Sequence, residues 1–331
     1  MIRLVATGSL LTLMLSVVPA FAQNVHLAVI VGLAGDPEHG ALFQKWGAAL
    51  VDAGMKRYGI PRERIIYLVE KAGGEGPAST GRSTREEISK AFQALAQNAA
   101  SDDVVFVILI GHGTFDGRVA KFNLPGPDMT PAEFEPLLKR LGPRRVVLVN
   151  TASASGPFIE ALSGPGRTIV TATRNGAERF ATLFGGFFVD ALTADAADAD
   201  KNKRVTVLEA FDYARREVTT AYEREGIMLT EHALLDDTGD REGTAQPTAD
   251  GKEGRVASIL SLGTAETGEV PADPKLRALY DERRALERRV ESLRLLKESM
   301  EPQRYASELE KALTELALKS RQIRDAGGKA R

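Results

Sequence analysis

The chain has 331 residues, a formal net charge of −2 at pH 7 and no cysteine. The near-neutral charge argues against a nucleic-acid groove or a polybasic membrane patch, so we expect no nucleic-acid partner but proteins, peptides or small ligands. A chain without cysteine has no disulfides, no lipidated cysteine and no catalytic thiol.

The first residues predict a cleavable signal peptide. Arg3 precedes an apolar run that ends in Ala20-Phe21-Ala22, a small-x-small pattern that signal peptidases cut. The run is shorter than the ~20 apolar residues that span a bilayer, which disfavours the alternative of a membrane anchor. We therefore exclude residues 1–22 from the fold. We expect a periplasmic or secreted protein, cut after Ala22, with no membrane association after cleavage.

Residues 23–270 are predicted to form one α/β domain. Five nearly continuous apolar runs are typical of strands buried on both faces of a parallel sheet, namely residues 25–32, 64–70, 104–111, 145–150 and 167–173. Capping-box patterns at Ser83–Glu86 and Thr130–Glu133 predict helix starts between them. This alternation predicts a doubly wound, mostly parallel sheet with right-handed crossovers. The apolar run at residues 255–263 predicts one further strand.

Two of the predicted strands end in residues that carry chemistry. The strand from Val104 runs into Gly111-His112-Gly113, and the next predicted strand is followed by Ser153. Ligands of such sheets bind outside the carboxyl ends of the strands. If the two strands are neighbours, His112 and Ser153 face one crevice.

From about residue 25 to residue 243 the chain resembles the legumain (asparaginyl endopeptidase) family of the caspase-like clan. The resemblance rests on the apolar strand that ends in His112-Gly113, on the ASASG motif at residues 152–156 after the next strand, and on the segment between them. It implies a caspase-like α/β fold with His112 as the base and Gly113 as an oxyanion donor. It also places Ser153 where the family has its nucleophilic cysteine.

Serine at this position changes the expected chemistry. A thiol is partly ionised near neutral pH, whereas a serine hydroxyl needs an oriented base to remove its proton. Asp116 follows His112 closely, but its surroundings favour the cap of a turn over the orientation of that histidine. The sequence thus favours a catalytically impaired peptidase homologue, a pseudoenzyme that binds a peptide or protein ligand. The alternatives are an active serine-type peptidase or hydrolase that uses Ser153 and His112, and purely structural roles for both residues.

A second motif predicts a calcium loop. Oxygen-bearing side chains occupy the first, third, fifth, ninth and twelfth places of a twelve-residue segment followed by a helix: Asp198, Asp200, Asn202, Thr206 and Glu209. This is the ligand spacing of an EF-hand, although Lys203 stands where glycine normally makes the sharp turn. The alternative is an acidic surface turn with Glu209 early in a helix. No cofactor is required by the predicted chemistry, and calcium is the one ion that the sequence suggests.

The remaining acidic and imidazole groups carry weaker signals. The stretch from Leu235 to Asp240 is interpreted as a turn rich in aspartate, with a cation site as the alternative. His26, His39 and His232 form no zinc-ligand spacing with one another or with a cysteine, so a zinc enzyme is not expected.

Residues 271–331 are predicted to form a helical tail. Leu279, Leu286, Leu293 and Met300 recur every seven residues, and a second helix follows Pro302. We interpret the tail as a helical hairpin or coiled coil for self-association or for docking a protein partner. The alternative is a helix pair that packs back on the α/β domain.

Overall fold

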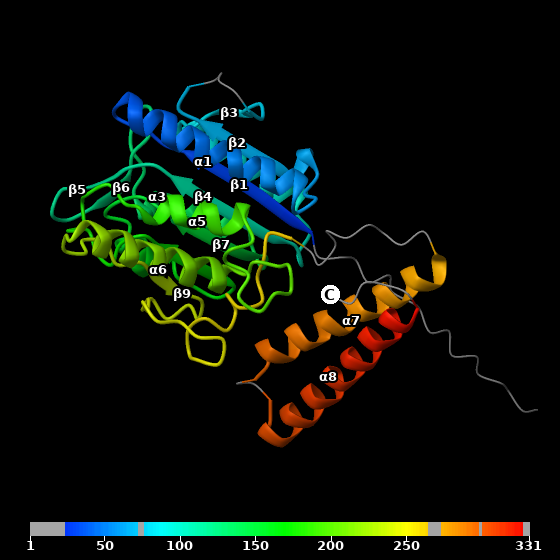
Figure 1. The fold of residues 1–331 in the computed structure, drawn as a ribbon. Helices are drawn as coiled ribbons and strands as arrows, with labels where there is room; N and C mark the ends of the chain where they lie inside the picture. The colour runs from blue at the N-terminus through cyan, green and yellow to red at the C-terminus, as the bar shows by residue number, and fades with distance from the viewer. Residues whose placement is uncertain (1–23, 72–75, 264–272, 298–299, 327–331) are drawn as a thin grey trace, which may run out of the picture.

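The computed structural model describes residues 24–71, 76–263, 273–297 and 300–326 (Figure 1). The predicted signal peptide at residues 1–22 lies outside these residues. Among the helices in these ranges, none is both long and apolar enough to cross a membrane.

Within the described residues, a seven-stranded sheet with the order β3-β2-β1-β4-β7-β8-β9 forms the centre of the molecule. Its strands are β1 (Val25–Val31), β2 (Ile65–Val69), β3 (Gly81–Arg82), β4 (Val104–Ile110), β7 (Arg145–Asn150), β8 (Arg167–Thr171) and β9 (Leu234–Asp236). All neighbours run parallel except β9, which pairs antiparallel with β8. The five apolar runs are therefore confirmed as strands.

Helices cover both faces of this sheet, as the doubly wound fold requires. One face carries α1 (Pro37–Lys56), α5 (Phe184–Thr193) and α6 (Val207–Glu225), and the other carries α2 (Arg85–Asn98), α3 (Pro131–Arg140) and the short α4 (Pro157–Leu162). The strands alternate between the two cores: Leu27 and Val29 face the first, and Ala28 and Ile30 face the second. Each large aliphatic side chain buried in this way contributes ~1.5–3 kcal/mol. The mixed sheet with flanking helices is a caspase-like α/β fold.

Side-chain caps fix where the helices begin. The Asp36 carboxylate accepts the His39 N–H at the start of α1, and the Thr84 hydroxyl accepts the Glu87 N–H at the start of α2. Capping boxes open α3 at Thr130 and α6 at Thr206, so the predicted helix start at Thr130 is confirmed.

A small hairpin follows β4 at the carboxyl edge of the sheet. It consists of β5 (Gly113–Phe115) and β6 (Ala120–Phe122), which pair antiparallel. Elsewhere in the chain, a short 3₁₀ helix, η1 (Arg62–Arg64), precedes β2. The Asp116 carboxylate accepts the Arg118 and Val119 N–H groups at 2.9 Å each. Asp116 thus caps the hairpin turn, as its sequence context predicted.

The strand predicted at residues 255–263 is wrong. This segment forms turns, with only a single bridge between Ser261 and Thr206. Its carbonyl groups serve the first turn of α6 instead: Ala257 accepts the Leu208 N–H and Leu260 accepts the Val207 N–H. The apolar residues are buried beneath this helix start, so their burial needs no strand.

The tail contains the two predicted helices, α7 (Pro274–Leu295) and α8 (Pro302–Asp325). They pack on each other around Val290, Leu293 and Ala312. Ion pairs between Arg289 and Glu308 and between Lys319 and Glu282 set an antiparallel arrangement. The tail is therefore a helical hairpin with a small core of its own (Figure 1).

Candidate functional site

The ends of β4 and β7 lie side by side at the carboxyl edge of the sheet. Leu109 pairs with Asn150 in register, and the Leu109 carbonyl accepts both the N–H of Thr151, at 3.0 Å, and its hydroxyl, at 2.9 Å. The residues that follow the two strands, His112 and Ser153, therefore lie at the same edge of the sheet, but only His112 lines the cleft described below.

Ser153 is held by the backbone of Gly113. Its hydroxyl donates to the Gly113 carbonyl at 3.0 Å and accepts the Gly113 N–H at 3.2 Å. The serine is 3% exposed. The approach requires glycine, because a Cβ at residue 113 would lie 2.1 Å from the Ser153 carbonyl oxygen. The hydroxyl at the nucleophile position and the expected oxyanion donor thus satisfy each other.

The loop after Ser153 is fixed by the end of β8. Ala154 has a left-handed φ of 53°, and its N–H donates to the Glu178 carbonyl at 2.8 Å. The Ser155 hydroxyl accepts the N–H groups of Ala172 and Thr173 at 3.1 and 3.2 Å. These bonds hold the nucleophile position in one conformation.

The His112 ring contacts the start of α1. It makes edge contacts with His39 at 4.6 Å and with Phe43 at 5.0 Å between centroids. In the described part of the chain no hydrogen bond joins the His112 ring to Ser153. Burial lowers the pKa of the His112 imidazole, and His39 lowers it further, while Asp36 and a hydrogen bond with the Ala34 backbone oppose that shift. The ring is therefore neutral at pH 7.

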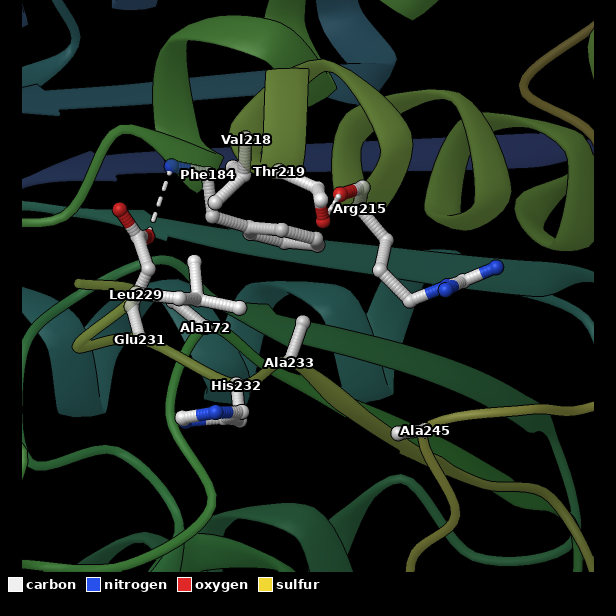
Figure 2. Close-up of a pocket in the computed structure, with 10 residues that line it drawn as sticks. All are labelled: Ala172, Phe184, Arg215, Val218, Thr219, Leu229, Glu231, His232, Ala233 and Ala245. Atoms are coloured by element: carbon white, nitrogen blue, oxygen red, sulfur yellow. Dashed lines mark hydrogen bonds between the residues drawn. The ribbon is translucent and has the colours of Figure 1, made fainter. Parts of the chain in front are cut away.

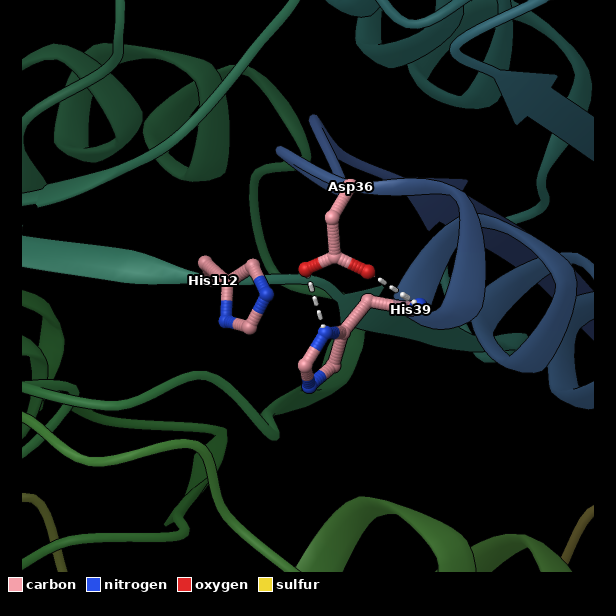
Figure 3. Close-up of side chains that lie close together, drawn as sticks. All are labelled: Asp36, His39 and His112. Carbon is pink, nitrogen blue, oxygen red and sulfur yellow. Dashed lines mark hydrogen bonds and ion pairs between the residues drawn. The ribbon is translucent and has the colours of Figure 1, made fainter.

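Two residues that the sequence did not single out complete this half of the site (Figure 3). Asp36 accepts the His39 N–H at 2.9 Å through one carboxylate oxygen, and the other lies 2.7 Å from His39 Nδ1. Donor atoms of Asp36, His39 and His112 all lie within 4.8 Å of one another. We call these three residues the imidazole cluster. In the sequence, His39 showed only that it has no zinc-ligand spacing, and Asp36 gave no signal of a site.

Two clefts open beside the imidazole cluster. One, of about 280 Å³, is lined by His39 and His112 together with Phe43, Trp46, Thr151, Thr182, Phe187 and Asp190 among others. The other, of about 410 Å³, is lined by Asp36, Phe43 and residues from the ends of β1 and β2. A peptide segment in the first cleft would contact His112 but not the buried Ser153 hydroxyl.

A third, smaller pocket of about 110 Å³ lies between α6 and the segment before β9 (Figure 2). Phe184, Val218 and Leu229 give it a mainly apolar wall. Glu231 points to the start of α5, where it accepts the Leu183 and Phe184 N–H groups at 2.8 and 3.1 Å. Burial raises the pKa of this carboxyl. Its bonds cap α5, which gives Glu231 a structural role.

The predicted calcium loop brings three of its five candidate ligands together. Carboxylate oxygens of Asp198, Asp200 and Glu209 lie within 4.8 Å of one another. The Asp198 carboxylate also accepts the Asn202 and Lys203 N–H groups, at 3.0 and 2.8 Å. Lys203 has a left-handed φ of 65°, so the backbone makes the turn that glycine makes in an EF-hand.

The other two candidate ligands are engaged within the loop. The Asn202 side chain accepts the Arg204 N–H at 2.7 Å and donates to Asp200 at 2.8 Å. The Thr206 hydroxyl donates to Glu209 at 2.9 Å, as part of the capping box of α6. The loop therefore brings three carboxylates together and is braced by hydrogen bonds among its own residues.

The acidic stretch after Leu235 forms the predicted turn. One Asp236 oxygen accepts the Thr238 and Gly239 N–H groups at 3.1 and 2.9 Å. Oxygens of Asp236, Asp240 and Glu253 lie within 4.8 Å of one another. Burial raises the pKa of Glu253 to about 7, against hydrogen bonds from the Asp237 N–H and the Thr238 hydroxyl, and so reduces the crowded negative charge at neutral pH.

A comparison with protein-family models agrees with the resemblance at these strand ends. A model of the Peptidase C13 family, the legumain family of the caspase-like clan, matches residues 84–234. A crystal structure of a Geobacter sulfurreducens protein is similar at 13% identity, with a TM-score of 0.40 over 69% of this chain and 95% of that chain. No curated protein matches the chain. The matched residues include β4, β7, His112 and Ser153, so the centre of this chain is similar to the legumain-type peptidases.

Proposed function

We propose that this protein is an exported, legumain-like peptidase homologue with impaired catalysis, which binds a peptide or protein segment in the cleft beside His112. The observation that carries the proposal is the state of Ser153. Its hydroxyl is buried and is bonded to both the N–H and the carbonyl of Gly113. A nucleophile must be reached by its base, yet the His112 ring lies against His39 and Phe43.

The cleft itself suits a peptide. Trp46, Phe43 and Phe187 supply apolar surface, and Thr151, Thr182 and Asp190 supply polar groups along it. Thr182 already donates to the Thr151 carbonyl at 2.6 Å, which holds the cleft wall to the end of β7. A binding role needs this shape alone and does not need an activated serine.

The alternative proposal is an active serine-type peptidase or hydrolase that uses Ser153 and His112. It requires a movement that frees the Ser153 hydroxyl from Gly113 and turns the His112 ring toward it. The same movement would free the Gly113 N–H as an oxyanion donor.

Covalent capture separates these two proposals. The mature protein is incubated with a fluorophosphonate probe and its intact mass is compared with those of Ser153→Ala and His112→Ala. We expect no mass increase in the folded wild-type protein. A mass increase that needs both residues would overturn the impaired assignment and establish an activated serine.

We further propose that the loop at residues 198–209 binds calcium as a structural ion in front of α6. The convergence of Asp198, Asp200 and Glu209 and the left-handed turn at Lys203 support this assignment. Calcium should then raise the unfolding temperature of the wild-type protein and leave that of Asp198→Asn unchanged. An equal rise in both proteins would reject the site.

The tail is proposed as the assembly surface, for a second copy or for a protein partner. Leu296, Leu313 and Leu318 are exposed on the helical hairpin, whose own core is small. Sedimentation of the full chain and of a chain ending before Pro274 tests this role. An unchanged mass in solution and an unchanged set of bound partners would reject it.

A further inference from the structure

The chain has only four histidines and no cysteine, and the fold brings two of those histidines together. His39 lies at the start of α1 and His112 follows β4, and their ring centroids are 4.6 Å apart. His26 is buried against Asp103, and His232 contacts Glu178, so the other two histidines each face one carboxylate. The nitrogen ligands that this protein can offer to a metal ion are therefore concentrated at one place.

Asp36 adds an oxygen ligand to the two imidazoles. Donor atoms of all three side chains lie within 4.8 Å of one another, and Asp36 and His39 are about half and one-third exposed. His39 Nδ1 is engaged by Asp36, whereas no described residue forms a hydrogen bond with His39 Nε2 (Figure 3). Because Nδ1 and Nε2 point away from each other, an ion shared by Asp36 and His39 would replace the hydrogen bond at Nδ1, which makes Nδ1 the ligand atom of His39.

The surroundings of the imidazole cluster leave room for an ion and its remaining ligands. His39 and His112 line the cleft of about 280 Å³, and Asp36 lines the cleft of about 410 Å³. Phe43 lines both clefts and packs against both rings, which limits the rotation of the imidazoles. Water or a ligand can therefore reach the cluster, while its two rings stay in place.

We propose that Asp36, His39 and His112 bind a divalent transition-metal ion of the zinc class. Two imidazoles with one carboxylate form a ligand set that suits zinc and its neighbours, whereas calcium and magnesium prefer oxygen ligands alone. Three protein ligands leave at least one coordination position for water or for a bound group.

An ion at this place holds His112 and so prevents it from acting as a base toward Ser153. This consequence rests on the proposed function of the cleft, whereas the metal site itself does not. A metal ion bound here would also present an open position to a carboxylate or carbonyl oxygen of a peptide in the cleft.

The test measures metal binding to the untagged mature chain, without a peptide or a probe. Zinc binding is followed by titration calorimetry, and cobalt binding by the visible absorption that nitrogen and oxygen ligands induce. We expect one ion per chain, with an affinity at least about tenfold lower in His39→Gln and in His112→Gln, and lower also in Asp36→Asn.

His232→Gln is the matched control, because His232 Nδ1 also lies 2.7 Å from a carboxylate oxygen and its side chain is similarly exposed. We expect this variant to bind zinc as the wild type does. Loss of binding in His232→Gln equal to that in His39→Gln, or wild-type binding no tighter than in the double variant of His39 and His112, would overturn the proposal.

A measurement on the wild-type protein keeps the test valid if a variant fails to fold. With four histidines in the chain, zinc should shift the imidazole NMR signals of His39 and His112 and leave those of His26 and His232 in place. Shifts confined to His26 or His232 would place the ion elsewhere and reject the site.

Discussion

The two halves of the candidate site differ in how their polar groups are used. In the Ser153 loop the polar groups are bonded within the protein: the Ser153 hydroxyl to Gly113, the Ala154 N–H to Glu178 and the Gly156 N–H to Thr173. In the imidazole cluster the rings contact each other and line open clefts. The hydroxyl expected to act as the nucleophile, that of Ser153, is therefore buried and hydrogen-bonded, whereas the imidazole expected to act as its base, that of His112, lines an open cleft.

Replacing Gly113 should disturb the closed Ser153 loop more than any other change proposed here. We expect Gly113→Ala to lower the free energy of unfolding by ~3 kcal/mol, because the new Cβ would lie 2.1 Å from the Ser153 carbonyl oxygen and a backbone atom moves less readily than a side-chain end. Denaturant unfolding measures the loss.

Gly117→Ala is the control for this change. Gly117 lies in the same hairpin, has a φ of +97° and has no atom within 4 Å of an added Cβ, so only ~1 kcal/mol of backbone strain is expected. Equal losses in the two variants would show that the contact between Gly113 and the Ser153 loop is loose.

Replacing Ser153 shows whether its hydroxyl stabilises the fold or is held in a strained geometry, because the two cases change stability in opposite directions. Ser153→Ala removes the partner of the buried Gly113 N–H, so we expect a loss of ~1–3 kcal/mol in the free energy of unfolding. If the serine were held in a strained, reactive geometry, Ser153→Ala would instead raise the free energy of unfolding. A gain measured by denaturant unfolding would therefore favour the serine-type hydrolase.

The positions of His112 and Ser153 after their strands were predictable from sequence because these signals are local. Apolar runs identified β4 and β7, and the residues after each strand named His112 and Ser153. What could not be predicted was the state of the Ser153 hydroxyl, since its bonds depend on how closely two strand ends approach.

The rest of the imidazole cluster, Asp36 and His39, was missed for the opposite reason. His39 and His112 lie on α1 and after β4, far apart in the sequence, and no spacing rule joins them. Only the parallel pairing of β1 with β4 brings the start of α1 to the end of β4. The wrong strand at residues 255–263 has a similar cause, because burial beneath α6 gives the same apolar pattern as burial in a sheet.

The buried His26–Asp103 pair offers a test of how burial changes the protonation of an imidazole elsewhere in the protein. His26 Nε2 lies 3.1 Å from Asp103, and burial lowers the pKa of His26 below its usual 6.5. Below pH 6.5 the unfolded chain binds a proton at this residue more readily than the folded chain does. Stability should therefore fall as the pH drops from 6.5 through the folded pKa, by up to ~1.4 kcal/mol per unit.

Unfolding of the wild type and of His26→Gln across pH 7 to 5 measures this contribution, because the other titrating groups are common to both proteins. We expect a shallower pH dependence in the variant. Parallel curves would mean that His26 is protonated equally in the folded and unfolded chains.

The loop at residues 198–209, like the Ser153 loop, is braced by hydrogen bonds within the protein, and it also brings three carboxylates close together. The backbone conformation of Lys203 affects both the stability of this loop and its proposed binding of calcium. A non-glycine residue at a φ of 65° costs ~1 kcal/mol, and glycine relieves that strain while it adds entropy to the unfolded chain. We expect Lys203→Gly to raise the free energy of unfolding by at most ~1 kcal/mol and to bind calcium more tightly. Lys203→Ala should show neither increase. Denaturant unfolding measures the stability and calorimetry the calcium affinity. Tighter calcium binding in both variants would instead assign the effect to the lost positive charge, and the left-handed turn would then play no part in holding the ion.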